Sequence, residues 1–232
     1  MNKIIVLMVL VLQSSMYFSQ AQKPKESLEK NMFLKEKLFG FSFNNSWVGF
    51  YDLKDSTFLK PVLGLHADFN YFFNENWGMA VQAGLQMRGT GIITPDYDNS
   101  VGNPDSTGRQ RHNIKSWEIP VVFYYRSNKE IVKNSRMIFG LGIIPMYHRK
   151  VLRKWYSVDD GFHSAVSYKE NFHAVDFPIR LSSGLDVNVP GGNLFRGSLI
   201  MDLGLKNNFK NPIDGKKSSR HFLLGVQLTF LF

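Results

Sequence analysis

The chain has 232 residues, with 28 Lys and Arg against 19 Asp and Glu, a formal net charge of +9 and no cysteine. The lack of cysteine excludes disulfides, a lipid-anchored cysteine and cysteine-ligated metals. The length is enough for one domain with a sizeable core, and the basic balance indicates a partner with an anionic surface.

The first 21 residues have the order of a secretory signal peptide. Met1-Asn2-Lys3 is charged, residues 4–12 are apolar, and Ser19-Gln20-Ala21 supplies small residues before a cleavage point. The apolar run is too short to cross a bilayer of about 30 Å as a helix. We expect cleavage after Ala21, export, and no nucleic-acid partner. Residues 22–37 are rich in Lys and Glu and are expected to form a solvated periplasmic arm.

The last twelve residues alternate strictly between two faces. One face is apolar and carries Phe222, Leu224, Val226, Leu228, Phe230 and Phe232. The other face carries Gly225, Gln227 and Thr229. The period of two predicts a strand with one apolar side. This ending resembles the terminal strand of bacterial outer-membrane β-barrels, and the resemblance implies that Phe230 and Phe232 are the signal read by the barrel-assembly machinery.

Similar alternating segments recur from residue 38 onward, which is the signature of a transmembrane barrel. The expected strands cover 38–50, 61–73, 77–88, 114–126, 136–148, 173–187, 194–206 and 221–232. Connections after the odd-numbered strands are longer than those after the even-numbered ones, as in a barrel with both termini in the periplasm. The pattern predicts an all-β fold: a closed, eight-stranded, antiparallel up-and-down transmembrane β-barrel over 38–232. A soluble β-sandwich or a lipocalin-type barrel is the structural alternative.

Three features of these segments lead to further predictions. Asn44 and Asn45 make the first strand the least regular. Pro120 lies inside the fourth strand, where a residue without an N–H requires a local bulge. Residues 89–113 have no period and are expected to be a long loop, whereas the strand formers within 149–171 predict a protruding ribbon. Interfacial aromatic girdles are expected from Tyr71, Phe73, Trp77, Tyr125 and Phe232 on the periplasmic side and from Trp117 and Tyr147 on the outer side.

The inward positions of the expected barrel hold five acids and five bases. They are Asp68, Glu118, Asp176, Asp186 and Asp202 with Arg88, Arg126, Arg180, Arg196 and Lys206. Eight strands leave an interior that side chains can fill, and unpaired buried charges are costly. We therefore expect an interior polar network of mutually paired charges, and no stable conductance. A small-solute pore is the alternative for this interior.

The segment Ser116-Trp117-Glu118-Ile119-Pro120-Val121-Val122-Phe123-Tyr124-Tyr125-Arg126 resembles the Glu-Ile-Pro strand of the PorT-like outer-membrane barrels of Bacteroidota. Phe139-Gly140-Leu141-Gly142 and the terminal aromatic strand match the same pattern. The first strand departs from that family's glycine-rich opening. The resemblance implies the barrel, and one branch of the family is associated with type IX secretion, so an accessory role with a secretion-system partner is an alternative function.

The densest basic run lies at 148–156, beyond the fifth strand. Lipopolysaccharide or another anion is expected to contact Arg149, Lys150, Arg153, Lys154, Lys216 and Lys217, with Arg220 beside them. Arginine pairs with phosphate in a bidentate manner, and lipopolysaccharide phosphates lie at the outer rim. The alternative is a solvated rim that only seats the barrel in outer-membrane lipid.

Histidines near the expected outer loops raise the alternative of a lipid A-modifying enzyme. His163-Ser164, His112, and His173 with Asp176 are the candidates. A histidine with a serine or an acid nearby is common by chance, and no His-Glu-x-x-His spacing occurs. We expect no catalytic, metal-binding or cofactor-binding residues. The sequence predicts a non-enzymatic outer-membrane barrel with a structural, adhesive or accessory role at the cell surface.

Overall fold

The computed structural model describes residues 37–50, 57–94, 108–157, 161–167, 169–189, 192–208, 210 and 220–232. Its elements are β1 (Lys37–Phe50), β2 (Thr57–Phe58), β3 (Lys60–Phe72), β4 (Trp77–Thr94), β5 (Gly108–Glu118), β6 (Val121–Val132), β7 (Ser135–Ile143), β8 (Met146–Ser157), β9 (Gly161–Ser167), η3 (Lys169–Asn171), β10 (Val175–Asp176), β11 (Ile179–Val189), β12 (Asn193–Leu203) and β13 (His221–Leu231). Within these ranges, no helix has the length and apolar character needed to cross a membrane.

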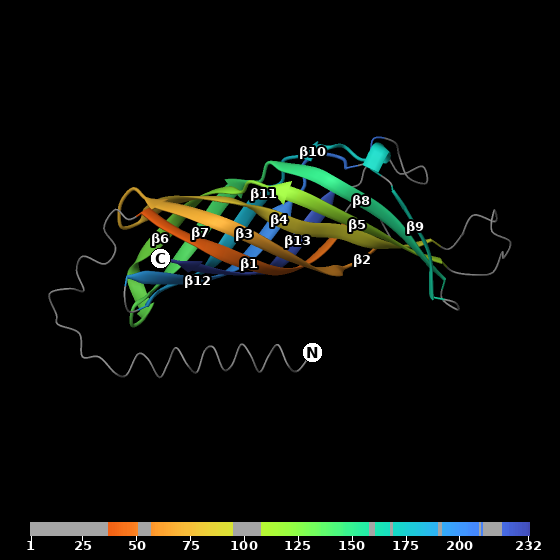
Figure 1. Ribbon diagram of the computed structural model, residues 1–232. Helices are drawn as coiled ribbons and strands as arrows, with labels where there is room; N and C mark the ends of the chain where they lie inside the picture. Colours follow the sequence, from red (N-terminus) through yellow and green to blue (C-terminus); the bar gives the residue numbers. More distant parts are fainter. Residues whose placement is uncertain are drawn as a thin grey trace.

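The strands close into one ring of eight antiparallel members (Figure 1). β5 with β6, β7 with β8, and β10 with β11 each form one interrupted strand of the wall, and successive wall strands pair with each other. The ring closes where β13 pairs with β1, from Gly40 opposite Leu231 to Phe50 opposite His221. The predicted closed, eight-stranded up-and-down topology is confirmed.

Each interruption of a wall strand coincides with a proline, at Pro120, Pro145 or Pro178. The carbonyls of these prolines still accept hydrogen bonds from the neighbouring strand, with N–O distances of 2.9 Å from Gln82, Ile119 and Ile144 in turn. Only the reverse bond is missing, because proline has no N–H to donate. The prolines therefore lie at the same level of three adjacent wall strands without breaking the wall.

The bulge expected at Pro120 is not found there. Glu118 opposite Gly84 and Val121 opposite Val81 keep one common register on either side of the proline. The register shifts instead between Lys115 and Ser116, against β8. The expected bulge was wrong because one missing backbone hydrogen bond costs less free energy than a one-residue shift of the strand. Such a shift would turn the inward side chains outward.

The polarity of the wall is the reverse of that of a water-soluble domain. Exposed apolar side chains stand on the outer face of every wall strand. Examples are Phe41, Leu65, Leu85, Phe123, Leu141, Leu181, Leu199 and Leu224. The inner face is polar: Leu65 is 63% exposed, whereas Asp68, three residues along the same strand, is 4% exposed. Such a sheet needs hydrocarbon rather than water around it.

Small apolar clusters complete the filling of the interior. Leu38, Phe72, Leu194 and Leu231 pack together near the first residues of β1. A second cluster, close to the other end of β1, consists of Val48, Val62, Ile200 and Leu223. The charged side chains described below lie between apolar layers, as expected of an interior that eight strands leave just wide enough for side chains.

The strands extend well past the predicted boundaries at one end of the barrel (Figure 1). β4 continues to Thr94 and pairs with β5 from Gly108, so much of the expected loop 89–113 is strand. β8 continues to Ser157 and pairs with β9, as the predicted ribbon requires. We call this extension of β4, β5, β8 and β9 the outer ribbon. Its strands have no alternating pattern because both of their faces lie beyond the apolar band.

The aromatic residues expected near the periplasmic boundary gather around the short turns. The rings of Trp77 and Tyr125 lie 5.1 Å apart, and those of Tyr71 and Phe73 lie 5.3 Å apart in an edge contact. Phe232 exchanges two backbone hydrogen bonds with Phe39, so the last residue lies in the closing seam.

At the outer side, Trp117 stands directly opposite Tyr147, in the pairing of β5 with β8. This pair marks the level at which the outer ribbon begins.

Candidate functional site

One centre of the interior network is Asp186 on β11. It accepts hydrogen bonds from Arg196 on β12, at 2.7 Å between Nε and Oδ1, and from Arg126 on β6, at 2.7 Å between Nη2 and Oδ2. The two guanidiniums also stack on aromatic rings, Arg126 at 3.9 Å from the Phe72 centroid and Arg196 at 4.2 Å from that of Tyr124. One carboxylate thus joins wall strands that are not neighbours.

The second centre is Asp202 on β12. Arg180 binds it through two nitrogens, at 2.7 and 2.9 Å, and Arg88 from β4 binds the same carboxylate at 2.8 Å. Arg88 also donates to Glu118 on β5 at 2.6 Å, and His66 Nε2 lies 3.7 Å from the other Glu118 oxygen. All five side chains are at most 3% exposed.

Gln82 connects the second centre to another interior acid, Asp68. Its amide nitrogen donates to Asp68, and its oxygen accepts a hydrogen bond from Arg180 at 3.3 Å. Buried ion pairs with good geometry are tolerated, whereas an unpaired buried charge is costly. The network therefore links β4, β5, β11 and β12 through side chains that meet across the lumen.

A third polar group lies nearer the outer ribbon. His148 Nδ1 is 2.9 Å from Ser116 Oγ, and His221 Nδ1 is 3.3 Å from an oxygen of Asp176. Asn208 approaches His221 Nδ1 to 2.8 Å. His148 and His221 both make these contacts through Nδ1.

η3 and the three residues that follow it, 169–174, pack against this group, and we call this segment the cap. Phe172, which follows η3, is 1% exposed, and its ring centroid lies 6.1 Å from that of His112. Two backbone bonds of 2.9 Å tie the cap to the segment after β12, one from His173 N to the Asn208 carbonyl and one from Lys210 N to the Asn171 carbonyl.

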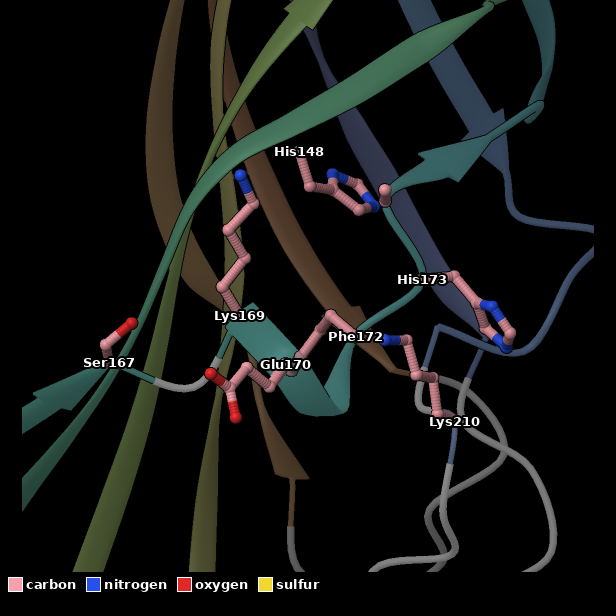
Figure 2. A pocket seen from close by; sticks show the side chains of 8 residues that line it. His148, Ser167, Lys169, Glu170, Phe172, His173 and Lys210 are labelled. Atoms are coloured by element: carbon pink, nitrogen blue, oxygen red, sulfur yellow. The ribbon is translucent and has the colours of Figure 1, made fainter.

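A pocket of about 360 Å³ lies against this cap (Figure 2). Its lining includes His148, Lys169, Glu170, Phe172, His173 and Lys210. Burial, together with the nearby charges of Lys206 and Lys210, lowers the pKa of His173 below its usual value. Two lysines, Lys169 and Lys210, against one acid, Glu170, give the lining a net positive charge.

The outer ribbon brings basic side chains of two strands into register. Lys115 on β5 stands opposite Lys150 on β8, and Arg111 stands opposite Lys154. The Lys115 and Lys150 pair lies just beyond the pair of Trp117 and Tyr147. Like charges directly opposite each other destabilise a sheet, so this arrangement favours an anion between them. The sequence indicated the β8 residues through their density but gave no reason to select the two on β5.

The structure places nine of the ten expected network residues in the interior, each at most 4% exposed. The tenth, Lys206, is exposed, and its expected inward position was wrong. β12 ends at Leu203, and Gly204 N then bonds to the His221 carbonyl, so the alternation stops before Lys206 is reached. Asp176 faces inward but contacts His221 rather than an arginine.

The basic residues expected to contact an anion divide into two groups. Arg149 and Lys150 are exposed at the base of the outer ribbon, whereas Arg153 and Lys154 are half-buried on β8. Arg220 is exposed immediately before β13. Lys216 and Lys217 lie outside the described residues.

Of the histidine groups suspected of catalysis, the two whose side chains the structure describes make other contacts. Asp176 is engaged by His221 rather than His173, and His112 is buried beneath Phe172. The side chains of His163 and Ser164 lie outside the described residues. Among the residues with described positions, no cluster of three or more His, Asp or Glu side chains could hold a metal ion.

Comparison with known proteins gives similarity only at the level of solved structures. No protein-family model matches the chain, and no curated protein matches it. The attachment invasion locus protein Ail of Yersinia pestis is 14% identical, with a TM-score of 0.41, and the alignment covers 85% of this chain and 99% of Ail.

Two further structures are similar to the same extent. Neisserial surface protein A is 11% identical, with a TM-score of 0.42, over 84% of this chain and 97% of that one. The outer-membrane protein OprG of Pseudomonas aeruginosa is 12% identical, with a TM-score of 0.43, over 87% and 98%. The PorT-like resemblance has no support from these comparisons and stays a prediction. The fold itself follows from the strand pairing of this chain: it is a closed ring of eight antiparallel wall strands with an apolar outer face and a polar inner face.

Proposed function

We propose that the protein is a non-enzymatic integral outer-membrane barrel whose outer ribbon binds anionic groups at the cell surface. The observation that carries the proposal is the pairing of like charges, Lys115 with Lys150 and Arg111 with Lys154, on two strands that leave the apolar band. A stable fold aligns such charges only at a small but definite cost in free energy. Phosphate between the two strands offsets that cost.

Three properties support the outer-membrane location. The outer face of the wall is apolar, the inner face is polar, and the ring is closed, which together suit a sheet surrounded by lipid. The expected signal peptide would direct the export of the chain. The terminal strand, with Phe232 hydrogen-bonded to β1, supports the expected role of Phe230 and Phe232 in assembly.

The level of the basic pairs supports lipopolysaccharide as the anion. Aromatic girdles mark the two interfaces of an outer-membrane barrel, and the Trp117 and Tyr147 pair is the outermost described member of this girdle. The charged pair formed by Lys115 and Lys150 comes next beyond that aromatic pair, and Arg111 and Lys154 lie farther along the same strands. Phosphates of the lipid and of the core sugars are the anions that we propose for these two pairs.

The test compares binding of the purified protein to vesicles that contain lipopolysaccharide with binding to vesicles of neutral lipid. Replacing Arg111, Lys115, Lys150 and Lys154 together with Gln is expected to weaken lipopolysaccharide binding at least tenfold and to flatten its salt dependence. The matched control replaces with Gln two lysines, Lys129 and Lys133, that are exposed at the opposite end of the barrel. Equal loss of binding in both variants contradicts the proposal.

The filled interior supports a role other than transport. Nine buried charged side chains occupy the lumen between apolar clusters. We expect no steady single-channel current from the purified protein in planar bilayers. Large and reproducible channels would favour the small-solute pore instead. The secretion-accessory role rests on the PorT-like resemblance alone, and no contact in the structure favours it.

A further inference from the structure

The outer face of β1 carries one amide in an otherwise aromatic row. Phe39, Phe41, Phe43 and Trp47 are exposed on this face by 56%, 60%, 38% and 49%. Asn45 is exposed between the last two. The inner face of the same strand already has its own amide, Asn44, which donates to Gln86 at 3.2 Å.

Asn45 lies near the middle of the apolar band. It stands opposite Val226, which is the central residue of β13, and opposite Leu63 on β3. A tilted strand climbs roughly 2.5 Å of membrane height per residue, so ten residues of β1 span about the 25 Å of the band. Asn45 therefore lies within the apolar band, two residues from Trp47 on the outer face of β1.

The side chain of Asn45 has no hydrogen-bond partner within the part of the chain that the structure describes. A carboxamide has two donor hydrogens and an accepting oxygen, and hydrocarbon satisfies none of them. A polar group at this depth favours a protein surface over lipid, because only protein brings a matching group.

We propose that the outer face of β1, with its neighbours β3 and β13, docks a second copy of this chain through reciprocal Asn45 hydrogen bonds. A carboxamide is self-complementary: two copies related by a two-fold axis each donate to the oxygen of the other, and the same patch serves both subunits. Phe43 and Trp47 flank the amide and supply the large apolar contact that such interfaces use. The proposal is independent of the outer ribbon and of its anion.

The first test uses the lack of native cysteine. An Asn45→Cys variant, assembled in outer membranes and treated with a membrane-permeable oxidant, is expected to form a disulfide-linked dimer. The control is Leu141→Cys on β7, the fourth wall strand from β1 in either direction, where the side chain is 58% exposed. At equal expression, we expect at least fivefold more linked dimer from position 45 than from position 141.

The second test separates docking from folding. Asn45→Leu removes an unsatisfied amide from the apolar band, so the folded monomer is expected to resist urea at least as well as the parent. In the same variant the dimer dissociation constant in lipid, measured by energy transfer between labelled copies, is expected to rise about tenfold. Equal crosslinking at positions 45 and 141, an unchanged dissociation constant, or capture of a different protein at position 45 would each overturn the proposal.

Discussion

The interior network and the outer ribbon both contain many charges, but they arrange them in opposite ways. In the interior, Asp186 and Asp202 each lie between two guanidiniums, and every arginine has a carboxylate within 3 Å. On the outer ribbon, two pairs of directly opposite residues, Arg111 with Lys154 and Lys115 with Lys150, carry charges of the same sign.

This difference separates two uses of charge. A pair of opposite charges in a dry lumen is satisfied within the chain, and it distinguishes the correct strand register from a shifted one. Like charges on opposite strands repel each other, and an anion between them would reduce that repulsion. The interior arrangement therefore stabilises the fold, whereas the role that we propose for the ribbon arrangement is to bind an anionic partner.

The largest expected effect comes from breaking an interior centre. Asp202→Asn keeps the size of the side chain but leaves Arg180 and Arg88 without the shared carboxylate, and removing one partner of a buried pair costs about 3–5 kcal/mol. Urea unfolding of the protein in lipid, followed by tryptophan fluorescence, measures the change.

The control for that substitution is Ser198→Ala on the same strand. Ser198 is 4% exposed, and its hydroxyl has no hydrogen-bond partner in the described structure, so its loss is expected to cost less than about 1 kcal/mol. If the two variants unfold at the same urea concentration, the interior charges do not hold the barrel together in the way described.

A smaller effect is expected at the boundary between the two regions. Phe172→Ala removes the buried ring of the cap. The same change in a well-packed core that cannot relax costs about 3–5 kcal/mol of unfolding free energy. Because the cap is a short segment, we expect local opening rather than loss of the barrel. Exchange of the His173 and Lys210 amide hydrogens should accelerate at least tenfold, while the urea midpoint changes little.

The exposed neighbour Glu170 provides the control for the cap, since Glu170→Ala removes no buried surface. If Phe172→Ala lowered the urea midpoint as much as Asp202→Asn does, the cap would belong to the same cooperative unit as the interior network. The boundary between the two regions would then lie farther out, on the ribbon itself.

The sequence predicted the wall far better than the ends of the wall. Alternation of apolar and polar residues has a physical cause where lipid touches one face, so the inward positions of Asp68, Arg88 and Asp202 could be read from it. Beyond the band this cause disappears, and the strand extensions to Thr94 and Ser157 carried no pattern. The predicted inward position of Lys206 was wrong for the same reason. We had extended the period of two beyond Leu203, where β12 ends.

The sequence predicted which charged residues face the interior better than it predicted which of them form ion pairs with each other. Equal numbers of acids and bases predicted that charges pair, but not that Asp186 and Asp202 would each serve two arginines, because this depends on strands far apart in the chain. The like-charge pairs of the ribbon depend on the bulge between Lys115 and Ser116, which sets the register with β8. A one-residue difference in that register would have placed other residues opposite Lys150.

The smallest expected effect concerns the stability of the ribbon variant, with Arg111, Lys115, Lys150 and Lys154 replaced by Gln. Removing two like-charge pairs is expected to raise the free energy of unfolding slightly, by about 0.2–1 kcal/mol for each pair, although the same variant binds lipopolysaccharide less well. Urea unfolding in neutral lipid, at low and high salt, measures this change, and the difference from the parent should shrink as salt screens the repulsion. A variant that is clearly less stable than the parent would show that these residues are satisfied within the ribbon, and the contrast with the interior would fail.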